Sequence, residues 1–92
     1  MIYELIFMPD AERHLMEWRK SGQKKTIKKI LDLLDELRHH PTTGTGQVEQ
    51  LRGNMAGYWS RRIDKGSRMV YAIDDGRVVV TVVSMRGHYS DK

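Results

Sequence analysis

The chain has 92 residues, with 16 Lys or Arg and 12 Asp or Glu, and a net charge of +4 at neutral pH. This length predicts one small domain over residues 1–92. No apolar run approaches the roughly 20 residues that span a bilayer, and we expect neither a membrane segment nor a signal peptide. The chain has no Cys, which excludes disulfides and thiolate-bound zinc and fits a cytoplasmic protein.

The basic surplus is uneven along the chain. Residues 1–46 carry a net charge of +1 and residues 47–92 a net charge of +3, and the basic residues change from mostly Lys to mostly Arg. Arginine has a planar fork of donors that suits phosphate. This favours a polyanion-binding surface in the second half, with a merely soluble basic domain as the alternative.

The first half predicts a strand and two helices. Residues 2–7, IYELIF, are typical of a short, largely buried strand, and Pro9 and Asp10 mark a helix start. A break at 21–23 separates this helix from a second one, which should end near residue 39 because Pro41 disfavours helical geometry at His40. The apolar stripes expected on the two helices are Met8, Ala11, Leu15 and Trp18, then Ile27, Ile30, Leu31, Leu34 and Leu37.

The second half predicts a sheet. QVEQL at 47–51 could form an edge strand, and three longer strands are expected at 58–63, 68–73 and 78–85. Asp75-Gly76 between the last two is a hairpin signal. The order β-α-α-β-β-β-β predicts an α+β domain, with two N-terminal helices packed on one face of a mostly antiparallel sheet.

Strand alternation decides which polar side chains can meet. Arg62 and Arg68 should share the face away from the helices, and Arg86 or His88 would join them if the last strand continues without a bulge. By the same alternation, Arg61 is expected at the solvent or at the rim of the core. Cations gathered on one small face repel one another unless an anion binds between them.

Glu49 is the carboxylate near these strands that does not lie in an obvious turn. A carboxylate, guanidinium groups, an imidazole and a phenol are together the parts of a ribonuclease that needs no metal. A base takes the proton of the 2′-hydroxyl, a cation stabilises the charged phosphorane, and an acid protonates the leaving 5′-oxygen.

A metal site is not expected. Adjacent helical residues point about 100° apart, so His39 and His40 make a poor chelate, and no Cys or suitably spaced Asp joins them. We expect no cofactor.

Four short motifs resemble one known family. These are G-x-G-x-x-E-x-L at 44–51, GYWSRRI at 57–63, RMVYAI at 68–73 and GHY at 87–89. Together with the order of helices and strands, they are similar to the YoeB/Txe branch of the RelE/ParE toxin superfamily over essentially the whole chain.

The resemblance implies a toxin of a bacterial type II toxin–antitoxin system that cuts mRNA at the ribosomal A site. It implies Glu49, Arg68 and His88 as catalytic residues, with Arg62, Tyr89, Arg52 and Arg86 as substrate-binding candidates. The implied partners are the ribosome with its mRNA and a YefM/Axe-like antitoxin that neutralises the toxin, and a homodimer fits the family.

The sequence departs from the family pattern at three points. Three residues follow the His-Tyr pair, Gln50 stands where proline is familiar, and Arg52 replaces a frequent lysine. None removes a required chemical group.

Alternative functions stay open at this point. A ParE-like toxin of the same fold binds DNA gyrase without enzymatic activity, and a plain RNA-binding module is also possible, although neither needs the Glu-Arg-His set. A degenerate toxin that acts only in a repressor complex with its antitoxin is a third alternative.

Overall fold

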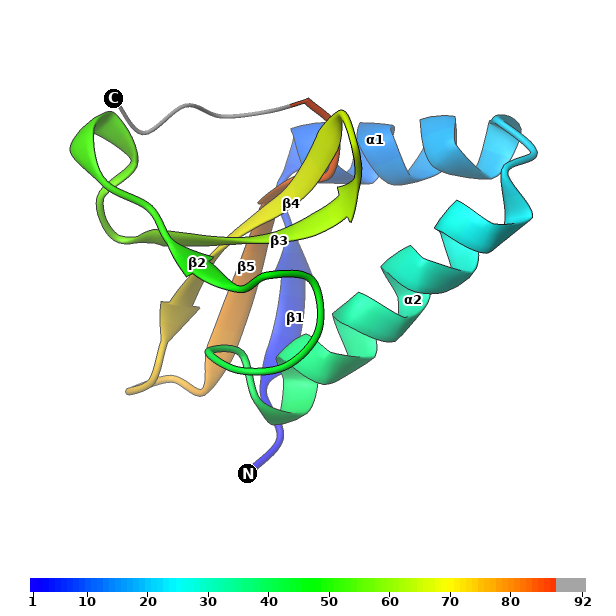
Figure 1. Ribbon diagram of the computed structural model, residues 1–92. Coiled ribbons are helices and arrows are strands. Elements are labelled where there is room, and N and C mark those ends of the chain that lie inside the picture. The colour runs from blue at the N-terminus through cyan, green and yellow to red at the C-terminus, as the bar shows by residue number, and fades with distance from the viewer. Residues whose placement is uncertain (88–92) are drawn as a thin grey trace.

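The computed structural model describes residues 1–87. Their order confirms the predicted β-α-α-β-β-β-β arrangement, and the second helix ends at residue 39, as Pro41 predicts. A short 3₁₀ helix, η1, lies in the turn between the second and third strands. The elements are β1 (Glu4–Phe7), α1 (Pro9–Lys20), α2 (Lys24–His39), β2 (Glu49–Gln50), η1 (Gly53–Met55), β3 (Tyr58–Asp64), β4 (Ser67–Asp74) and β5 (Val79–Ser84) (Figure 1).

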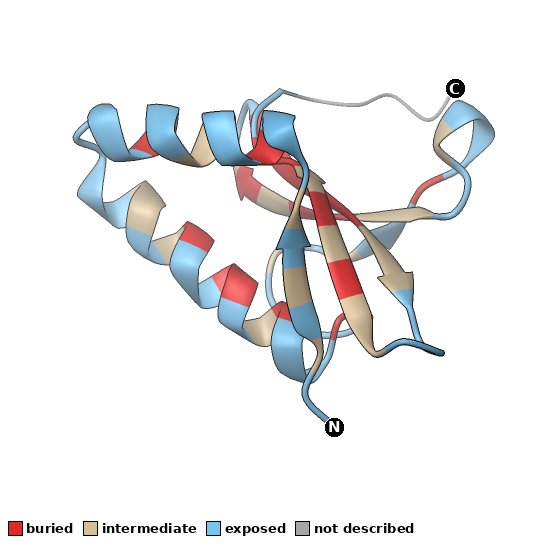
Figure 2. Ribbon diagram, turned by 180° about the vertical axis from the view of Figure 1, so that it is seen from behind, coloured by how far each residue is buried: buried red, intermediate tan, exposed pale blue. Residues whose placement is uncertain are grey.

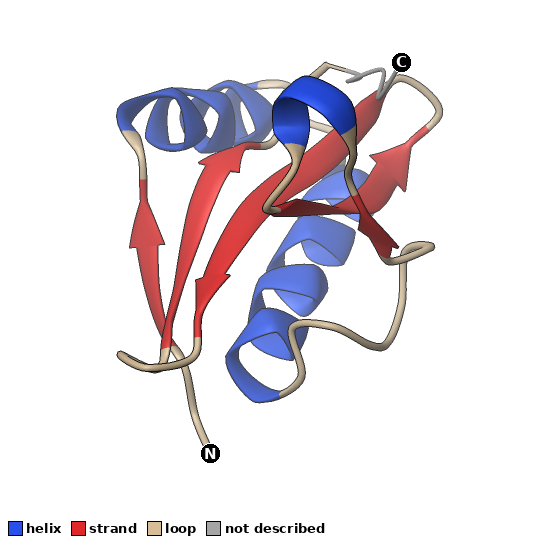
Figure 3. Ribbon diagram, turned by 90° about the vertical axis from the view of Figure 1, so that its left-hand side faces the viewer, coloured by secondary structure: helices blue, strands red, loops and turns tan. Residues whose placement is uncertain are grey.

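The five strands form one mixed sheet in the order β1-β5-β4-β3-β2. Within the described part of the chain, β1 pairs with β5 in parallel, and the pairings of β5 with β4, β4 with β3 and β3 with β2 are antiparallel. Both helices pack on the same side of the sheet (Figure 3), so the α+β prediction is confirmed. The short strand β2 forms one edge of the sheet. Because α1 and α2 both pack on one side, neither of them covers the opposite face of β2, β3 and β4, which we call the helix-free face.

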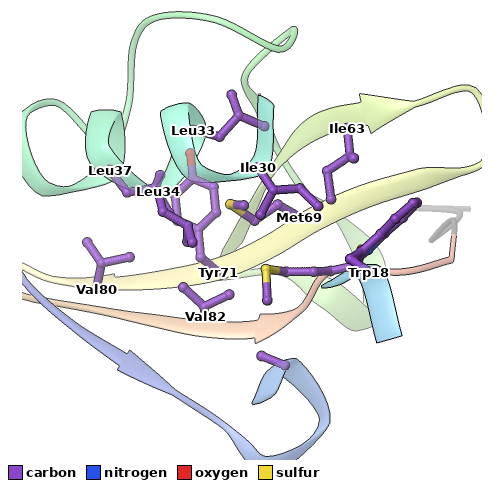
Figure 4. Close-up of a cluster of buried hydrophobic side chains, with 12 residues drawn as sticks. Trp18, Ile30, Leu33, Leu34, Leu37, Ile63, Met69, Tyr71, Val80 and Val82 are labelled. Carbon is purple, nitrogen blue, oxygen red and sulfur yellow. The ribbon is translucent and has the colours of Figure 1, made fainter. Parts of the chain in front are cut away.

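The core lies between the helices and the sheet. Figure 4 shows Tyr71 and Met69 of β4 pointing toward Ile30 and Leu34 of α2. Met69 and Tyr71 are two residues apart in β4, so strand alternation puts them on the same face. The buried members of the cluster are Ala11, Trp18, Ile30, Leu33, Leu34, Leu37, Ile63, Met69, Tyr71, Val80, Val82 and Met85.

Three burial predictions are wrong. Met8, expected on the apolar stripe of the first helix, is 45% exposed, because it is the extended N-cap residue and not part of α1. Leu31 is 49% exposed and Leu33 is buried in its place, because Ile30, Leu33, Leu34 and Leu37 follow the i, i+3, i+4, i+7 spacing of one stripe. Strand β1 is not largely buried either. It is an edge strand whose alternate residues face away from the helices, which leaves Ile6 44% exposed (Figure 2).

A bulge changes the side-chain alternation of the last strand. Val82 pairs with Tyr71 and Ser84 pairs with the preceding residue, Val70, so that Val83 is an extra residue on β5. Val80 and Val82 therefore face the helices, whereas Ser84 lies on the opposite side with Val70. Met85 then turns back into the core.

Among residues 1–87, neither helix has the length and apolar character that crossing a membrane requires.

Candidate active site

Three of the predicted site residues meet on the helix-free face of β2, β3 and β4. Arg62 of β3 is directly opposite Arg68 of β4, and Glu49 of β2 is opposite Ser60 of β3. The Glu49 carboxylate lies 3.6 Å from Nη2 of Arg68. Sequence alternation had placed both arginines on this face, and the structure confirms that grouping.

Arg68 is held in place by its neighbours and is almost fully buried. Its Nε donates to the Ser60 hydroxyl at 2.8 Å, and its Nη2 donates to the Gln47 carbonyl at 2.8 Å and to the Ser60 carbonyl at 3.4 Å. Within residues 1–87, the two hydrogens on Nη1 have no recorded acceptor. The guanidinium is thus fixed on one side and keeps donors available on the other.

The electrostatics of the face favour an anionic ligand. Directly opposed like charges on neighbouring strands destabilise a sheet, and the single carboxylate of Glu49 offsets only one of the two guanidinium groups. Among residues 1–87, the Arg62 side chain makes one weak hydrogen bond, from Nε to the Asp64 carbonyl at 3.4 Å. A phosphodiester between Arg62 and Arg68 would neutralise the remaining charge.

The Glu49 side chain is 61% exposed, in contrast to Arg68 beside it. An exposed carboxylate next to a buried, fixed cation can reach a bound substrate without first leaving a packed environment. The arrangement offers a proton acceptor and two phosphate ligands on one open surface. Within residues 1–87, no cluster of His, Asp or Glu is placed to hold a metal ion.

The loop before β2 contributes backbone groups to the site. The Gly46 carbonyl accepts a hydrogen bond from the Arg62 amide, and the next carbonyl, that of Gln47, is the one that holds Arg68. Both residues have positive φ, +95° for Gly46 and 51° for Gln47, a region that residues other than glycine adopt only where surroundings enforce it. Sequence reasoning did not identify Gln47 or Ser60, because a backbone carbonyl and a small hydroxyl leave no motif.

Arg61 is the largest error among the sequence predictions. It was expected at the solvent or at the rim of the core, but its side chain is 0% exposed. It pairs with Glu36 at 2.7 Å, and the Tyr71 hydroxyl and loop carbonyls accept its other hydrogen bonds. Strand alternation puts Arg61 on the same face of β3 as Ile63, a core residue, and a cation there must be fully bonded, which was the available signal.

The chain leaves β5 through the Met85–Gly87 segment, which α1 holds. The Trp18 indole N–H donates to the Met85 carbonyl at 2.8 Å, and the Met85 amide donates to Nδ1 of His14 at 3.1 Å. Gly87 is joined to the start of β4, because its carbonyl accepts a hydrogen bond from the Arg68 amide at 3.0 Å.

The expected position of Arg86 beside Arg62 and Arg68 is wrong. Its guanidinium lies 5.0 Å above the Trp18 ring and 3.4 Å from the Glu17 carboxylate, on the side of α1. Strand β5 ends at Ser84 and the chain bends at residues 85–87, so strand alternation does not extend to this residue.

The remaining site predictions stay predictions. His88 and Tyr89 lie outside the described residues, as does the 90–92 tail. Arg52 is exposed and precedes η1, three residues after Glu49. Among residues 1–87 it makes no recorded ion pair.

Comparison with known proteins identifies the family. Residues 7–89 match the model of the YoeB-like toxin of bacterial type II toxin–antitoxin systems. The chain belongs to this family. It is 40% identical over 83 residues to Toxin YoeB of Mycobacterium bovis, covering 90% of this chain and 94% of that protein. It is also 33% identical over 82 residues to the mRNA interferase toxin RelE of Escherichia coli, covering 86% and 79% of the two chains.

Solved structures agree with this membership of the YoeB-like family. The YoeB/ParE toxin from Agrobacterium tumefaciens superposes with a TM-score of 0.85 at 33% identity, covering 94% of this chain and 99% of that one. The toxin of the heterotetrameric YoeB–YefM toxin–antitoxin complex from Staphylococcus aureus superposes with a TM-score of 0.77 at 33% identity, covering 97% and 100%. The RelE/YoeB-like fold predicted from the sequence is therefore confirmed.

Proposed function

We propose that this YoeB-like toxin is an mRNA endoribonuclease that cuts messages at the ribosomal A site and so blocks translation. The observation that carries the proposal is the Glu49 carboxylate 3.6 Å from the buried Arg68 guanidinium, with Arg62 on the neighbouring strand. A relative of this chain is named an mRNA interferase, which supports the same substrate class. In this proposal residues 1–92 form one toxin domain that acts in the cytoplasm, where the ribosomes are.

The proposed reaction is an internal transesterification of RNA. Glu49 takes the proton from a 2′-hydroxyl, the 2′-oxygen forms a bond to the adjacent phosphorus, and the bond from phosphorus to the 5′-oxygen breaks. The products are a 2′,3′-cyclic phosphate and a 5′-hydroxyl, whose proton comes from a general acid. His88 is the candidate for that acid.

Arg68 and Arg62 are proposed to stabilise the phosphorane. The hydrogen bonds that fix Arg68 on Ser60 and Gln47 preorganise its free donors before substrate arrives. Fixed donors aimed at developing charge contribute more than mobile ones, because no reorganisation is needed during the reaction. Side chains alone supply the base and the charge stabilisation, so the proposed mechanism is independent of a metal ion.

The proposed partner is a small antitoxin of the YefM type that neutralises the toxin. Structures of YoeB–YefM complexes from Staphylococcus aureus and of a YoeB dimer from the same organism support an antitoxin partner and a possible homodimer. The net charge of +4 favours an acidic antitoxin segment.

The test uses a translation extract programmed with one defined message, and the 3′ ends that appear are mapped. We expect cuts at ribosome-bound codons with the wild-type chain, and a loss of at least about 100-fold in rate with Glu49→Gln, which removes the proton acceptor but keeps the shape. Glu12→Gln, an exposed position on α1, is the matched control and should cut normally. An intact message with the wild type, or inhibition of DNA supercoiling without RNA cleavage, would overturn the proposal in favour of a ParE-like activity.

A further inference from the structure

Arg61 has no hydrogen-bonding capacity left for a substrate. A guanidinium has five N–H donors, and all five have acceptors within 3.3 Å in this structure. Nε donates to the Tyr71 hydroxyl, and Nη1 donates to Glu36 Oε1 and the Thr45 carbonyl. Nη2 donates to the carbonyls of His40 and Thr43 at 2.8 and 2.7 Å.

Most of these acceptors belong to one loop, residues 40–47, which joins α2 to β2 (Figure 1). Two further contacts tie the same loop to the partners of Arg61. The Tyr71 hydroxyl donates to the Pro41 carbonyl at 2.6 Å, and Glu36 Oε1 accepts the Thr45 amide at 2.8 Å. The Arg61 network comprises Arg61, Glu36, Tyr71 and the backbone of 40–45, which winds around the buried guanidinium.

The loop leads directly from this network to the candidate active site. Immediately after Thr45, the Gly46 carbonyl bonds the Arg62 amide and the Gln47 carbonyl bonds Arg68. Glu49 follows two residues later. The strand that carries Glu49 has only two residues and cannot define its own position, so the path of the loop determines where the carboxylate lies.

We propose that Arg61 is a positioning residue, which places the Gln47 carbonyl and the Glu49 carboxylate against Arg68 without contacting substrate. The two neighbouring arginines of β3 thus have different roles on opposite faces of the sheet. Arg62 faces the substrate, and Arg61 holds the loop that completes the site. This inference rests on the proposed ribonuclease function only for its catalytic consequence. The positional effect can be measured separately.

The first test is Arg61→Lys, which keeps the charge but replaces five fixed donors by a single ammonium group. We expect the cleavage rate at saturating ribosomes to fall about 100-fold, the cost of displacing a catalytic group by roughly 1 Å. The ribosome concentration at half-maximal rate should stay within about twofold of wild type. Arg77→Lys, at a side chain 84% exposed in the β4–β5 turn, is the matched control.

A second variant displaces the loop while leaving Arg61 intact. Gly44 has φ of +119°, and a Cβ there would collide with Glu36 Oε1 and approach Nη1 of Arg61. Gly44→Ala should therefore lower the maximal rate in the same direction as Arg61→Lys. Gly66→Ala is the matched control, because Gly66 has no positive φ and nothing lies within 4 Å of its added Cβ.

Two measurements separate positioning from loss of folding and from failure of the proposed function. Circular dichroism gives the folded fraction, to which each rate is normalised, and NMR follows the amides of 47–50 and the Arg68 Nε–H. Shifted or broadened signals in Arg61→Lys and Gly44→Ala, with a folded core, are expected. Unchanged signals, or a wild-type rate per folded molecule, would overturn the inference. If the wild type itself cuts no RNA while these signals shift, the proposed function fails and the positional role of Arg61 stands.

Discussion

Two segments of the chain lead to or from the candidate active site, the loop before β2 and the Met85–Gly87 segment after β5. We call the contacts that hold them the first and the second support, and these differ in kind. The loop before β2 is held by a buried cation, with Arg61 completely enclosed and paired with Glu36. The Met85–Gly87 segment after β5 is held by α1, through neutral hydrogen bonds from Trp18 and to His14. The first support depends on an ion pair between charged groups, and the second on hydrogen bonds between neutral groups. They should therefore fail under different conditions.

The largest expected effect comes from removing the buried cation. Arg61→Met keeps much of the apolar stem but leaves the Glu36 carboxylate and several loop carbonyls without their donors. Because loss of one partner of a buried ion pair costs about 3–5 kcal/mol, we expect the free energy of unfolding in urea to fall by that amount. A variant already unfolded without urea also meets this expectation. Arg77→Met is the control, and a loss below about 1 kcal/mol for Arg61→Met would show that the network contributes little.

The corresponding change in the second support is Trp18→Phe. It keeps an aromatic ring in the core but removes the indole donor, which leaves the buried Met85 carbonyl unsatisfied. We expect a loss of about 1–3 kcal/mol in the free energy of unfolding. Equal losses for Trp18→Phe and Arg61→Met would remove the distinction between the two supports.

Acid should separate the two supports without any mutation. Burial is the largest cause that lowers the pKa of His14 below its ordinary value of 6.5, and the charges of Arg13 and Arg86 lower it further, against the opposing charges of Glu17 and Asp10. The neutral ring also accepts the Met85 amide hydrogen through Nδ1, and protonation there removes that bond. A His whose pKa is lower in the folded state contributes stability above pH 6.5 that is lost as the pH falls through the folded pKa.

Glu36 responds at lower pH. Burial raises the pKa of Glu36, but hydrogen bonds from Thr45 and the charge of Arg61 outweigh burial and hold it below its ordinary value of 4.5. Its contribution to stability is present above pH 4.5 and is lost as the pH falls through the lower folded pKa. Between pH 6.5 and pH 4.5 the second support should weaken while the Arg61 network stays intact.

The measurement is the free energy of unfolding from pH 8 to pH 5, for the wild type and for His14→Gln. The wild type should lose stability more steeply below pH 6.5 than the variant, since the other histidines are present in both proteins. Parallel curves would show that His14 does not contribute this pH dependence.

The smallest expected effect concerns the exposed end of the second support. Glu17→Gln removes the carboxylate 3.4 Å from Arg86, in a pair whose side chains are both more than 40% exposed. We expect a change below about 1 kcal/mol, which added salt should diminish further in the wild type. A larger, salt-independent loss would indicate that the two supports are more alike than their burial suggests.

The sequence predicted the fold well because its signals were local. Pro9 and Pro41 fixed two helix boundaries, Asp75-Gly76 marked a hairpin, and alternation placed Arg62 and Arg68 together. These features follow from neighbouring residues alone. Errors arose where alternation was extended past the end of a strand, as at Arg86, which lies two residues beyond the last residue of β5.

The supports of the site were harder to predict. In the Arg61 network, Glu36 lies 25 positions from Arg61, and the acceptors in the loop are backbone carbonyls, which are the same for every residue type. His14 and Trp18 reach Met85 across some 70 positions, and nothing in their local sequence indicates that contact. Glu49 and Arg68 were identified by the family resemblance and by their chemistry. The hydrogen bonds that hold these two residues in place could be identified only in the structure.

The parallel pairing of β1 with β5 has a consequence for how the chain is made. Glu4 pairs with Val79, and the contacts of α1 with Met85 are equally distant in sequence. During synthesis, β1 therefore has no strand to pair with, and α1 has no β5 to pack against, until residues 79–85 have left the ribosome. Contacts of such long sequence separation form slowly. A chain arrested before residue 79 would expose Leu5, Phe7 and Trp18 and be open to chaperones and proteases, so the sheet that carries the site is completed only with its last strand.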